Sequence, residues 1–346
     1  MLITKISKNS FFKRYDKCIY CNSKNLKKEK KQIYLENFYL NAIKSDLDLS
    51  SNQLNKMKVY KCQRCKILQS NPWFSDEIAR RIFSNIYGQH NRSWSNLINF
   101  LNKGITPDHG LLFKKLKKFI KINNYAEFNS PFMGLMMDFF SLEYKRSKFF
   151  YKNIFSNTLN YLSARQVAGK SVYQQKNSNQ KAYEFLKKCN ILKKKNSIKS
   201  KKKIKKYLFI DNSYLSWGEN DNFKSVNSKS FASELFDLQI FDLNHKRKKI
   251  KIDLFGIFHT LDHTQQPSKI LDFALSNSNY VLIYCHIDKW LEKQHLFSLT
   301  KDFMKYLNTK KIYIHDMTHV IEKKFKSPEL YFLCSKKKSY IDKFKK

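Results

Sequence analysis

The amino-acid sequence predicts an α/β protein in which a doubly wound, seven-stranded sheet follows a small N-terminal module that contains cysteines. Beyond residue 120, short and continuously apolar runs recur, as in strands that are covered on both faces. Helical segments lie between several of these runs, which is typical of a doubly wound sheet. The predicted strands span 125–129, 207–211, 238–243, 252–258, 280–286, 311–315 and 330–334, and the predicted helices between them span 134–140, 230–236, 267–276 and 299–307.

The N-terminal module carries two Cys-x-x-Cys pairs, Cys18 with Cys21 and Cys62 with Cys65. Two thiolates three residues apart can bind one metal ion from a tight turn, and a second pair completes the tetrahedral sulfur shell of structural zinc. The segment between the pairs is longer than the usual zinc-ribbon gap, so we expect a small insertion to loop out. A shell of four thiolates leaves no open coordination position. We therefore expect zinc to stabilise the fold and not to catalyse, the alternative being four unrelated buried thiols.

Three segments follow from these patterns. Residues 1–75 form the predicted zinc-binding module, residues 76–122 a helical linker, and residues 123–346 the α/β domain. A helical insertion is expected at 141–206, between the first two strands, and its Lys-rich end at 187–206 is interpreted as a solvated linker because it lacks interleaved aromatic residues. The linker helices are predicted at 78–87, 94–103 and 108–122 from polar caps and apolar residues at helical spacing.

The composition favours a folded protein, at 42% hydrophobic and 15% aromatic residues. The net charge of +39 invites a nucleic-acid partner, but only eight of the 67 basic residues are Arg, the residue best suited to bidentate phosphate and base contacts. Specific nucleic-acid binding is therefore disfavoured. No apolar run reaches the roughly 18 residues of a membrane-spanning helix. Seven cysteines, four of them at metal-binding spacing, fit a reducing cytoplasm better than a disulfide framework.

Three blocks of sequence resemble a known family. The second cysteine pair runs into Asn71-Pro72-Trp73-Phe74-Ser75, the segment from His259 to Pro267 reads His-Thr-Leu-Asp-His-Thr-Gln-Gln-Pro, and Gln294 begins Gln-His-Leu-Phe-Ser-Leu-Thr. In this order the blocks resemble those of class I S-adenosylmethionine (SAM)-dependent methyltransferases with an N-terminal zinc-binding module. The best-known members are C-methyltransferases that act on nucleotide-linked sugars. The resemblance implies a Rossmann-like fold, SAM as the cofactor and a small-molecule acceptor. Asp262 replaces the usual Glu of the second block, and Gln294 that of the third.

The chain departs from this family at the cofactor turn. Such enzymes hold SAM with a Gly-rich turn after the first strand, where a backbone without side chains can approach the ligand. Here the matching stretch runs from Glu127 to Gly134 and keeps only the final glycine. Asn129 and Ser130 can still turn the chain. Together with Gly134 they are the predicted cofactor-binding residues of this turn, although their neighbours carry Cβ atoms where the methionine part of SAM is expected.

Further site residues are predicted at the carboxyl ends of strands, where open α/β sheets bind ligands. Asp211 and Asp242 follow or end the second and third strands and are candidates for the ribose and the adenine. The alternative for both is a local turn or cap.

The predicted catalytic residues are His295, His259, His263 and Tyr87. The resemblance implies a general base at His295, and the ordinary pKa of imidazole suits that role. The two histidines after the fourth strand are candidates for contact with the reacting carbon and for a proton relay. Tyr87 stands where the family brings a tyrosine over the substrate. As alternatives, His295 is a loop residue that caps the next helix, and Tyr87 anchors its own helix.

Three hypotheses follow. The first is a cytoplasmic SAM-dependent methyltransferase acting on a small molecule, with nucleotide-linked sugars as the acceptor class that the resemblance implies. The second is a catalytically inactive relative that serves as a binding or scaffold protein, because the cofactor turn is eroded. The third is a zinc-ribbon protein that binds nucleic acid through its lysines, with affinity that falls steeply with salt.

Overall fold

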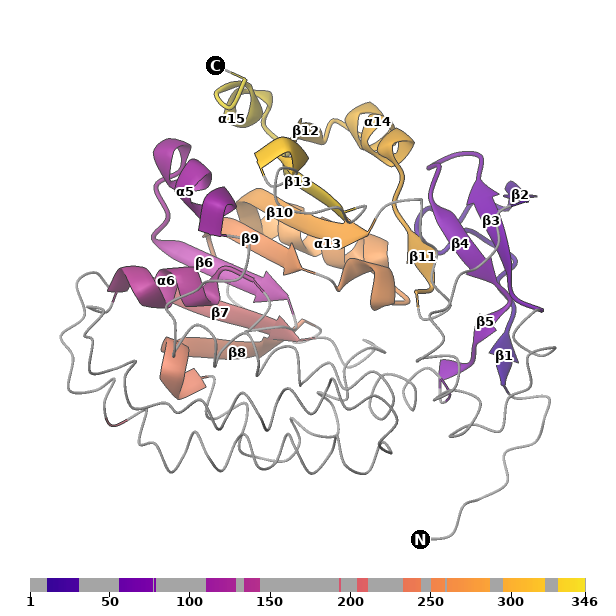
Figure 1. Ribbon diagram of the computed structural model, residues 1–346, viewed down its shortest axis with the longest axis horizontal. Coiled ribbons are helices and arrows are strands. Elements are labelled where there is room, and N and C mark those ends of the chain that lie inside the picture. Colours follow the sequence, from indigo (N-terminus) through magenta and orange to yellow (C-terminus); the bar gives the residue numbers. More distant parts are fainter. Residues whose placement is uncertain are drawn as a thin grey trace, which may run out of the picture.

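Seven strands form the central sheet of the computed structural model (Figure 1), which describes residues 11–30, 56–76, 78, 110–128, 134–143, 193, 204–210, 233–243, 250–258, 260–286, 295–320 and 329–345. In the described part of the chain, all seven predicted strands are confirmed, with ends that shift by up to two residues. They are β6 (Asn124–Phe128), β7 (Lys205–Ile210), β8 (Leu238–Asp242), β9 (Ile252–Phe258), β10 (Ser278–His286), β12 (Tyr313–Asp316) and β13 (Glu329–Ser335).

The strand order in this sheet is β12-β13-β10-β9-β6-β7-β8. Neighbouring strands from β10 to β8 are parallel, whereas β13 is antiparallel to both β10 and β12, so the sheet is mixed. The chain moves outward from β6 to β8 and then returns to β9 on the other side of β6. The order therefore reverses between β6 and β9, and the crevice beyond the carboxyl ends of these strands is where open α/β sheets bind ligands.

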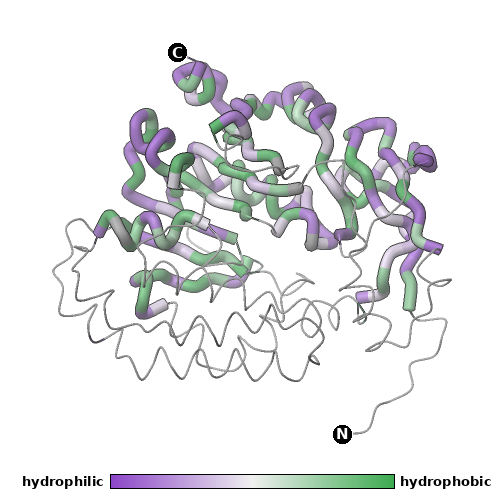
Figure 2. Tube along the Cα trace, viewed as in Figure 1, coloured by the Kyte–Doolittle hydropathy of each residue, from purple (hydrophilic) through white to green (hydrophobic). Residues whose placement is uncertain are grey.

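Helices cover both faces of the sheet. One apolar cluster joins the sheet to α5 (Gly110–Phe119), α6 (Met136–Glu143) and α15 (Lys338–Asp342). The opposite cluster joins it to α13 (Pro267–Asn277), α14 (Lys301–Thr309) and the cysteine module. Figure 2 shows hydrophobic residues gathered along the central strands and hydrophilic residues along α15. Burial on both faces explains why the strands read as continuous apolar runs.

The predicted helices of the sheet domain are confirmed with small shifts of their ends, and residues 233–236 are helical as predicted. The helix predicted from 299 begins later, at Lys301, because the Thr300 hydroxyl accepts a hydrogen bond from the Phe303 amide and caps it. The helix predicted at 108–122 is α5. Most of the helix predicted at 78–87, all of that at 94–103 and nearly all of the insertion lie outside the described residues.

The cysteine module is built on a second, four-stranded sheet. Its order is β11-β4-β3-β2, from β2 (Leu26–Lys28), β3 (Lys58–Cys62), β4 (Leu68–Asn71) and β11 (Phe297–Ser298). A short ribbon of β1 (Phe12–Lys13) and β5 (Trp73–Phe74) lies beside it. The fourth strand, β11, comes from the segment after β10, so the α/β part of the chain completes the sheet of the module (Figure 1).

One interpretation of the Lys-rich run is wrong at its end. Lys206 is not solvated: its side chain is 1% exposed, and its Nζ lies 2.7 Å from Oε2 of Glu143, which is 2% exposed. Glu143 also accepts a hydrogen bond from the Ile204 amide at 2.7 Å. The end of α6 is thereby joined to the start of β7. Lys193 and Lys205 are exposed, as the solvated-linker interpretation expects.

Across the described ranges, no helix is long and apolar enough to cross a membrane.

Candidate functional site

The four predicted metal ligands lie together. The Sγ atoms of Cys18, Cys21, Cys62 and Cys65 are all within 4.8 Å of one another. The closest pairs join the two knuckles: Cys18 to Cys65 at 3.4 Å and Cys21 to Cys62 at 3.5 Å. Cys18, Cys62 and Cys65 are fully buried, and Cys21 is partly buried. The described cysteines form no disulfides.

Both knuckles have the same backbone conformation. The Asn22 amide donates to the Cys18 carbonyl, and the Lys66 amide donates to the Cys62 carbonyl, each at 2.9 Å. The residue after each second cysteine is left-handed, with φ of 56° at Asn22 and 67° at Lys66. Asn tolerates this region better than Lys does. The two knuckles therefore have the same turn conformation, and each places two sulfurs at the common four-sulfur cluster.

The geometry of the four sulfurs fits a zinc ion. A tetrahedral site with Zn–S bonds of about 2.3 Å places its sulfurs about 3.8 Å apart, inside the range seen here. The thiols also compete for protons. A hydrogen bond with Cys65 lowers the pKa of Cys18 to about 6, whereas that bond and burial raise the pKa of Cys65, and burial raises that of Cys21 to about 11. A divalent cation would remove this competition by holding all four as thiolates.

A buried carboxyl group lies beside the predicted cofactor turn. Glu127, near the end of β6, is 1% exposed, and its Oε1 accepts hydrogen bonds from the Tyr125 hydroxyl and, at 3.1 Å, from the Met136 amide. Burial raises the pKa of Glu127 to about 8. A Cβ on Gly134 would collide with this carboxyl group and would lie 2.6 Å from Cδ2 of Phe258. Gly134 therefore lets the start of α6 approach β6 and β9 closely.

A second polar pair joins the segments that follow β9 and β10. Asp262 lies in the 3-10 turn η4 (Leu261–His263) after β9, and His295 precedes β11. Both are buried, and Nε2 of His295 is 3.7 Å from Oδ2 of Asp262. A carboxylate beside an imidazole can orient the ring and stabilise its protonated form. The helix cap that was the alternative role for His295 is provided by Thr300.

Two functional candidates were missed as site residues by sequence reasoning. Asp262 was noted only as a replacement for Glu, and Glu127 only as the start of the cofactor turn. Glu127 has a usable signal, namely an acidic residue within an otherwise apolar run at a strand end, whereas Asp262 stands among polar residues and has no such signal. An acidic residue in an apolar run is rarely buried without a partner, so the position of Glu127 indicates a polar contact in the interior.

The remaining predicted residues are only partly described. Asp242 ends β8 at the carboxyl edge, paired in register with Ile210 of β7, and is partly buried. His263 lies in η4, but its side chain is outside the described residues. Also outside them are Tyr87, Asn129, Ser130, Asp211 and His259.

Comparisons with known proteins do not assign this chain to a family. No protein-family profile matches the chain, and no curated protein matches it. Among solved structures, the plantazolicin methyltransferase BpumL in complex with SAH is similar over 75% of this chain and 95% of that one, with 10% identity and a TM-score of 0.33. BpumL with a triazolic desmethylPZN analog and SAH covers 75% and 96%, with 11% identity and a TM-score of 0.31. Similarity this low says nothing about the activity of the present chain.

Proposed function

We propose that this chain is a SAM-dependent methyltransferase that acts on a small molecule. The observation that carries the proposal is the place of the His295–Asp262 pair. It joins the segments that leave β9 and β10, next to the reversal of strand order between β6 and β9. An imidazole and a carboxylate at that edge can serve proton transfer to or from a bound ligand. The acceptor class implied by the sequence resemblance is a nucleotide-linked sugar.

The cofactor would be held by residues that leave three adjacent parallel strands. Asn129, Ser130 and Gly134 follow β6, Asp211 follows β7, and Asp242 ends β8. Adjacent strands are about 4.8 Å apart, so the ends of β6, β7 and β8 span about 10 Å along the carboxyl edge of the sheet. The acidic residues would accept hydrogen bonds from hydroxyl and amino groups of the adenosine. SAM supplies an electrophilic methyl group, so the protein has to align the acceptor and remove a proton from it.

His295 is the proposed general base. Its Nε2 faces Asp262, which would hold the imidazole in one tautomer and stabilise its charged form after proton transfer. The other ring nitrogen, Nδ1, would then receive the proton of the acceptor. His259, His263 and Tyr87 are proposed to surround the acceptor from the segment after β9 and from the linker. We propose that the chain divides into module 1–75, linker 76–122 and domain 123–346 with its insertion at 141–206, and that the acceptor would bind between the module and the sheet edge.

Four thiolates in a closed shell give the proposed zinc ion a structural role, and thiols of this kind suit the cytoplasm that we propose as its location. Elemental analysis of the purified protein should find close to one zinc per chain, and Cys62→Ser should lower that content sharply. A control substitution, Cys334→Ser, changes a buried cysteine of β13 outside the cluster and should leave the zinc content unchanged. Equal zinc in Cys62→Ser and the unsubstituted chain would refute the assignment.

The methyltransferase proposal is tested by calorimetric titration with S-adenosylhomocysteine (SAH). We expect saturable binding that weakens about 10- to 100-fold in Asp211→Asn, because hydrogen bonds to a charged group are each worth about 1.5–3 kcal/mol. Asp316→Asn, at the exposed end of β12, is the matched control and should bind as the unsubstituted chain does. His295→Gln should also keep its SAH affinity. Absence of binding at millimolar SAH would refute the proposal and favour the non-catalytic relative.

A further inference from the structure

The backbone next to His295 belongs to the sheet of the cysteine module. The Leu296 carbonyl accepts a hydrogen bond from the Ser70 amide at 2.9 Å, and β11 then pairs with β4 through Phe297 opposite Gln69 and Ser298 opposite Leu68. His295 directly precedes this pairing. Its backbone position therefore depends on β4, a strand of the cysteine module.

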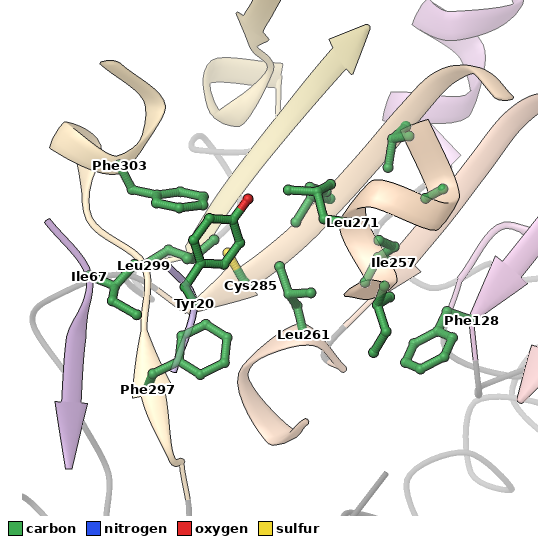
Figure 3. Packing of buried hydrophobic residues seen from close by; sticks show 14 of the residues in the cluster. Tyr20, Ile67, Phe128, Ile257, Leu261, Leu271, Cys285, Phe297, Leu299 and Phe303 are labelled. Carbon is green, nitrogen blue, oxygen red and sulfur yellow. The ribbon is translucent and has the colours of Figure 1, made fainter. Parts of the chain in front are cut away.

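Strand β4 is in turn connected to the first cysteine knuckle. The side chain of Gln69 is 1% exposed and bridges two backbone groups beside Cys18: its Oε1 accepts from the Ile19 amide at 3.1 Å, and its Nε2 donates to the Lys17 carbonyl at 3.4 Å. Tyr20, between the two cysteines of this knuckle, packs edge-on against Phe303 of α14 with ring centroids 4.8 Å apart. Figure 3 shows Tyr20 between Phe303 and Phe297.

The second knuckle reaches the same segment from its other side. The Thr300 hydroxyl donates a hydrogen bond to the Lys66 carbonyl at 2.9 Å, and Lys66 directly follows Cys65. Thr300 is 3% exposed and is also the cap of α14. Residues 296–300, which begin one residue after His295, are thus fixed at one end by β4 and at the other by a knuckle.

The segment that follows Asp262, the partner of His295, also contacts the cysteine module and the first residue of the linker. Gln265, three residues after Asp262, donates through Nε2 to Oδ1 of Asp76 and, at 3.5 Å, to the Tyr15 hydroxyl. The backbone of Tyr15 makes two hydrogen bonds with the Asn71 side chain, at 3.0 and 2.8 Å. Both members of the polar pair are therefore placed by segments that contact the same module.

We propose that the four-cysteine metal site is a positioning element for the His295–Asp262 pair, so that binding of a divalent metal ion fixes the imidazole against the carboxylate. The proposal gives a function to metal binding beyond holding the module together. Its significance for catalysis rests on the proposed function, but the coupling itself does not. A displacement of the base by about 1 Å can lower a rate about 100-fold, so positioning of this kind matters for chemistry.

Thr300→Val tests the coupling in the full chain. This change keeps the shape of the side chain and removes its hydrogen bond to Lys66 together with the cap bond from the Phe303 amide, whereas Gln69→Met leaves that cap intact and serves as the second test of the coupling. We expect the ring signals of His295, observed by NMR with isotope-labelled histidine and assigned through His295→Gln, to shift or broaden. Because coupling is reciprocal, we also expect the affinity for Zn²⁺, measured by competition with a chelator, to fall about 5-fold or more.

Two matched variants separate positioning from general damage. Thr300→Ser keeps the hydroxyl and should restore both the His295 signals and the Zn²⁺ affinity. Thr309→Val removes an exposed hydroxyl of the same helix, which donates to the Tyr306 carbonyl, and should change neither. If Thr300→Val does not fold, Gln69→Met breaks the bridge to the first knuckle and is judged by the same two measurements.

A folded variant with unchanged His295 signals and unchanged Zn²⁺ affinity would overturn the proposal. The parallel SAH titration keeps the two proposals apart. If the unsubstituted chain does not bind SAH but the His295 signals shift in Thr300→Val, the methyltransferase assignment is removed and the coupling stands. If the unsubstituted chain binds SAH but the His295 signals are unchanged in Thr300→Val, the coupling is refuted and the methyltransferase assignment stands.

Discussion

The buried ion pair between Lys206 and Glu143 gives a prediction whose size follows from the structure. At 2.7 Å and an effective dielectric constant of about 20, two unit charges attract by about 6 kcal/mol. Desolvation of two side chains that are 1% and 2% exposed costs several kcal/mol per ion, so the net contribution of the pair is small. Removal of one partner is different, because it leaves the other charge buried and uncompensated.

We therefore expect Lys206→Met to lower the free energy of unfolding by about 3–5 kcal/mol, and Glu143→Gln to lower it by a similar amount. The double variant should lose clearly less than the sum, because neither charge remains. Its residual cost of about 1–3 kcal/mol comes from the Ile204 carbonyl, which loses the Lys206 donor at 3.2 Å, whereas the amide oxygen of Gln can still accept from the Ile204 amide.

The measurement is denaturant unfolding of zinc-loaded protein followed by far-UV circular dichroism, with the midpoint shift at constant slope giving the difference in stability. Lys205→Met replaces the adjacent, exposed lysine and should stay within about 0.5 kcal/mol of the unsubstituted chain. The reasoning would be refuted if the two single variants cost under about 1 kcal/mol each, or if their effects added without coupling.

Three further predictions concern the turn at Gly134, the second cysteine knuckle at Lys66 and the buried carboxyl group of Glu127. Gly134→Ala should destabilise the fold by about 1–3 kcal/mol in thermal unfolding, because its Cβ meets Glu127 and Phe258. Lys66→Gly should stabilise the zinc-loaded protein by about 1 kcal/mol, because glycine adopts a φ of 67° without strain. Burial raises the pKa of Glu127 from 4.5 to about 8, so between these pH values the folded state holds a proton that the unfolded state has lost. The free energy of unfolding should therefore fall as the pH rises from about 4.5 to about 8, by at most about 1.4 kcal/mol per pH unit.

Two of these predictions have a control variant, and the third has an outcome that would contradict it. Glu127→Gln keeps an acceptor oxygen without titrating, and a pH profile identical to that of the unsubstituted chain would contradict the assignment of the slope to Glu127. Lys24→Gly changes an exposed loop lysine outside the left-handed region and should not stabilise. If Gly134→Ala unfolds at the same temperature as the unsubstituted chain, the close approach at that turn is not required for stability.

The architecture could be predicted because its signals are local. Strand β9 is continuously apolar from Leu254 to Phe258, and this pattern marks strands that are covered on both faces. The knuckles could be predicted for the same reason, since each pair of cysteines lies within four residues. The reversed direction of β13 could not be predicted, because its apolar run reads alike in either direction.

The candidate site was harder to predict because it depends on contacts between distant segments. His295 was singled out, but nothing near it in the sequence indicates that it faces Asp262 or that β11 joins the module. Lys206 was misinterpreted for a related reason. A lysine at the end of a lysine run is usually solvated, and its burial is stabilised by Glu143, which lies before the insertion.

The place of β11 in the sheet of the cysteine module also matters for biosynthesis. During translation the two knuckles leave the ribosome long before residues 297–298 do, so the edge of β4 has no strand to pair with while most of the chain is still being made. Unpaired strand edges invite association with other chains. A nascent or truncated chain that ends before β11 should therefore be prone to aggregate even when both of its cysteine knuckles have already formed.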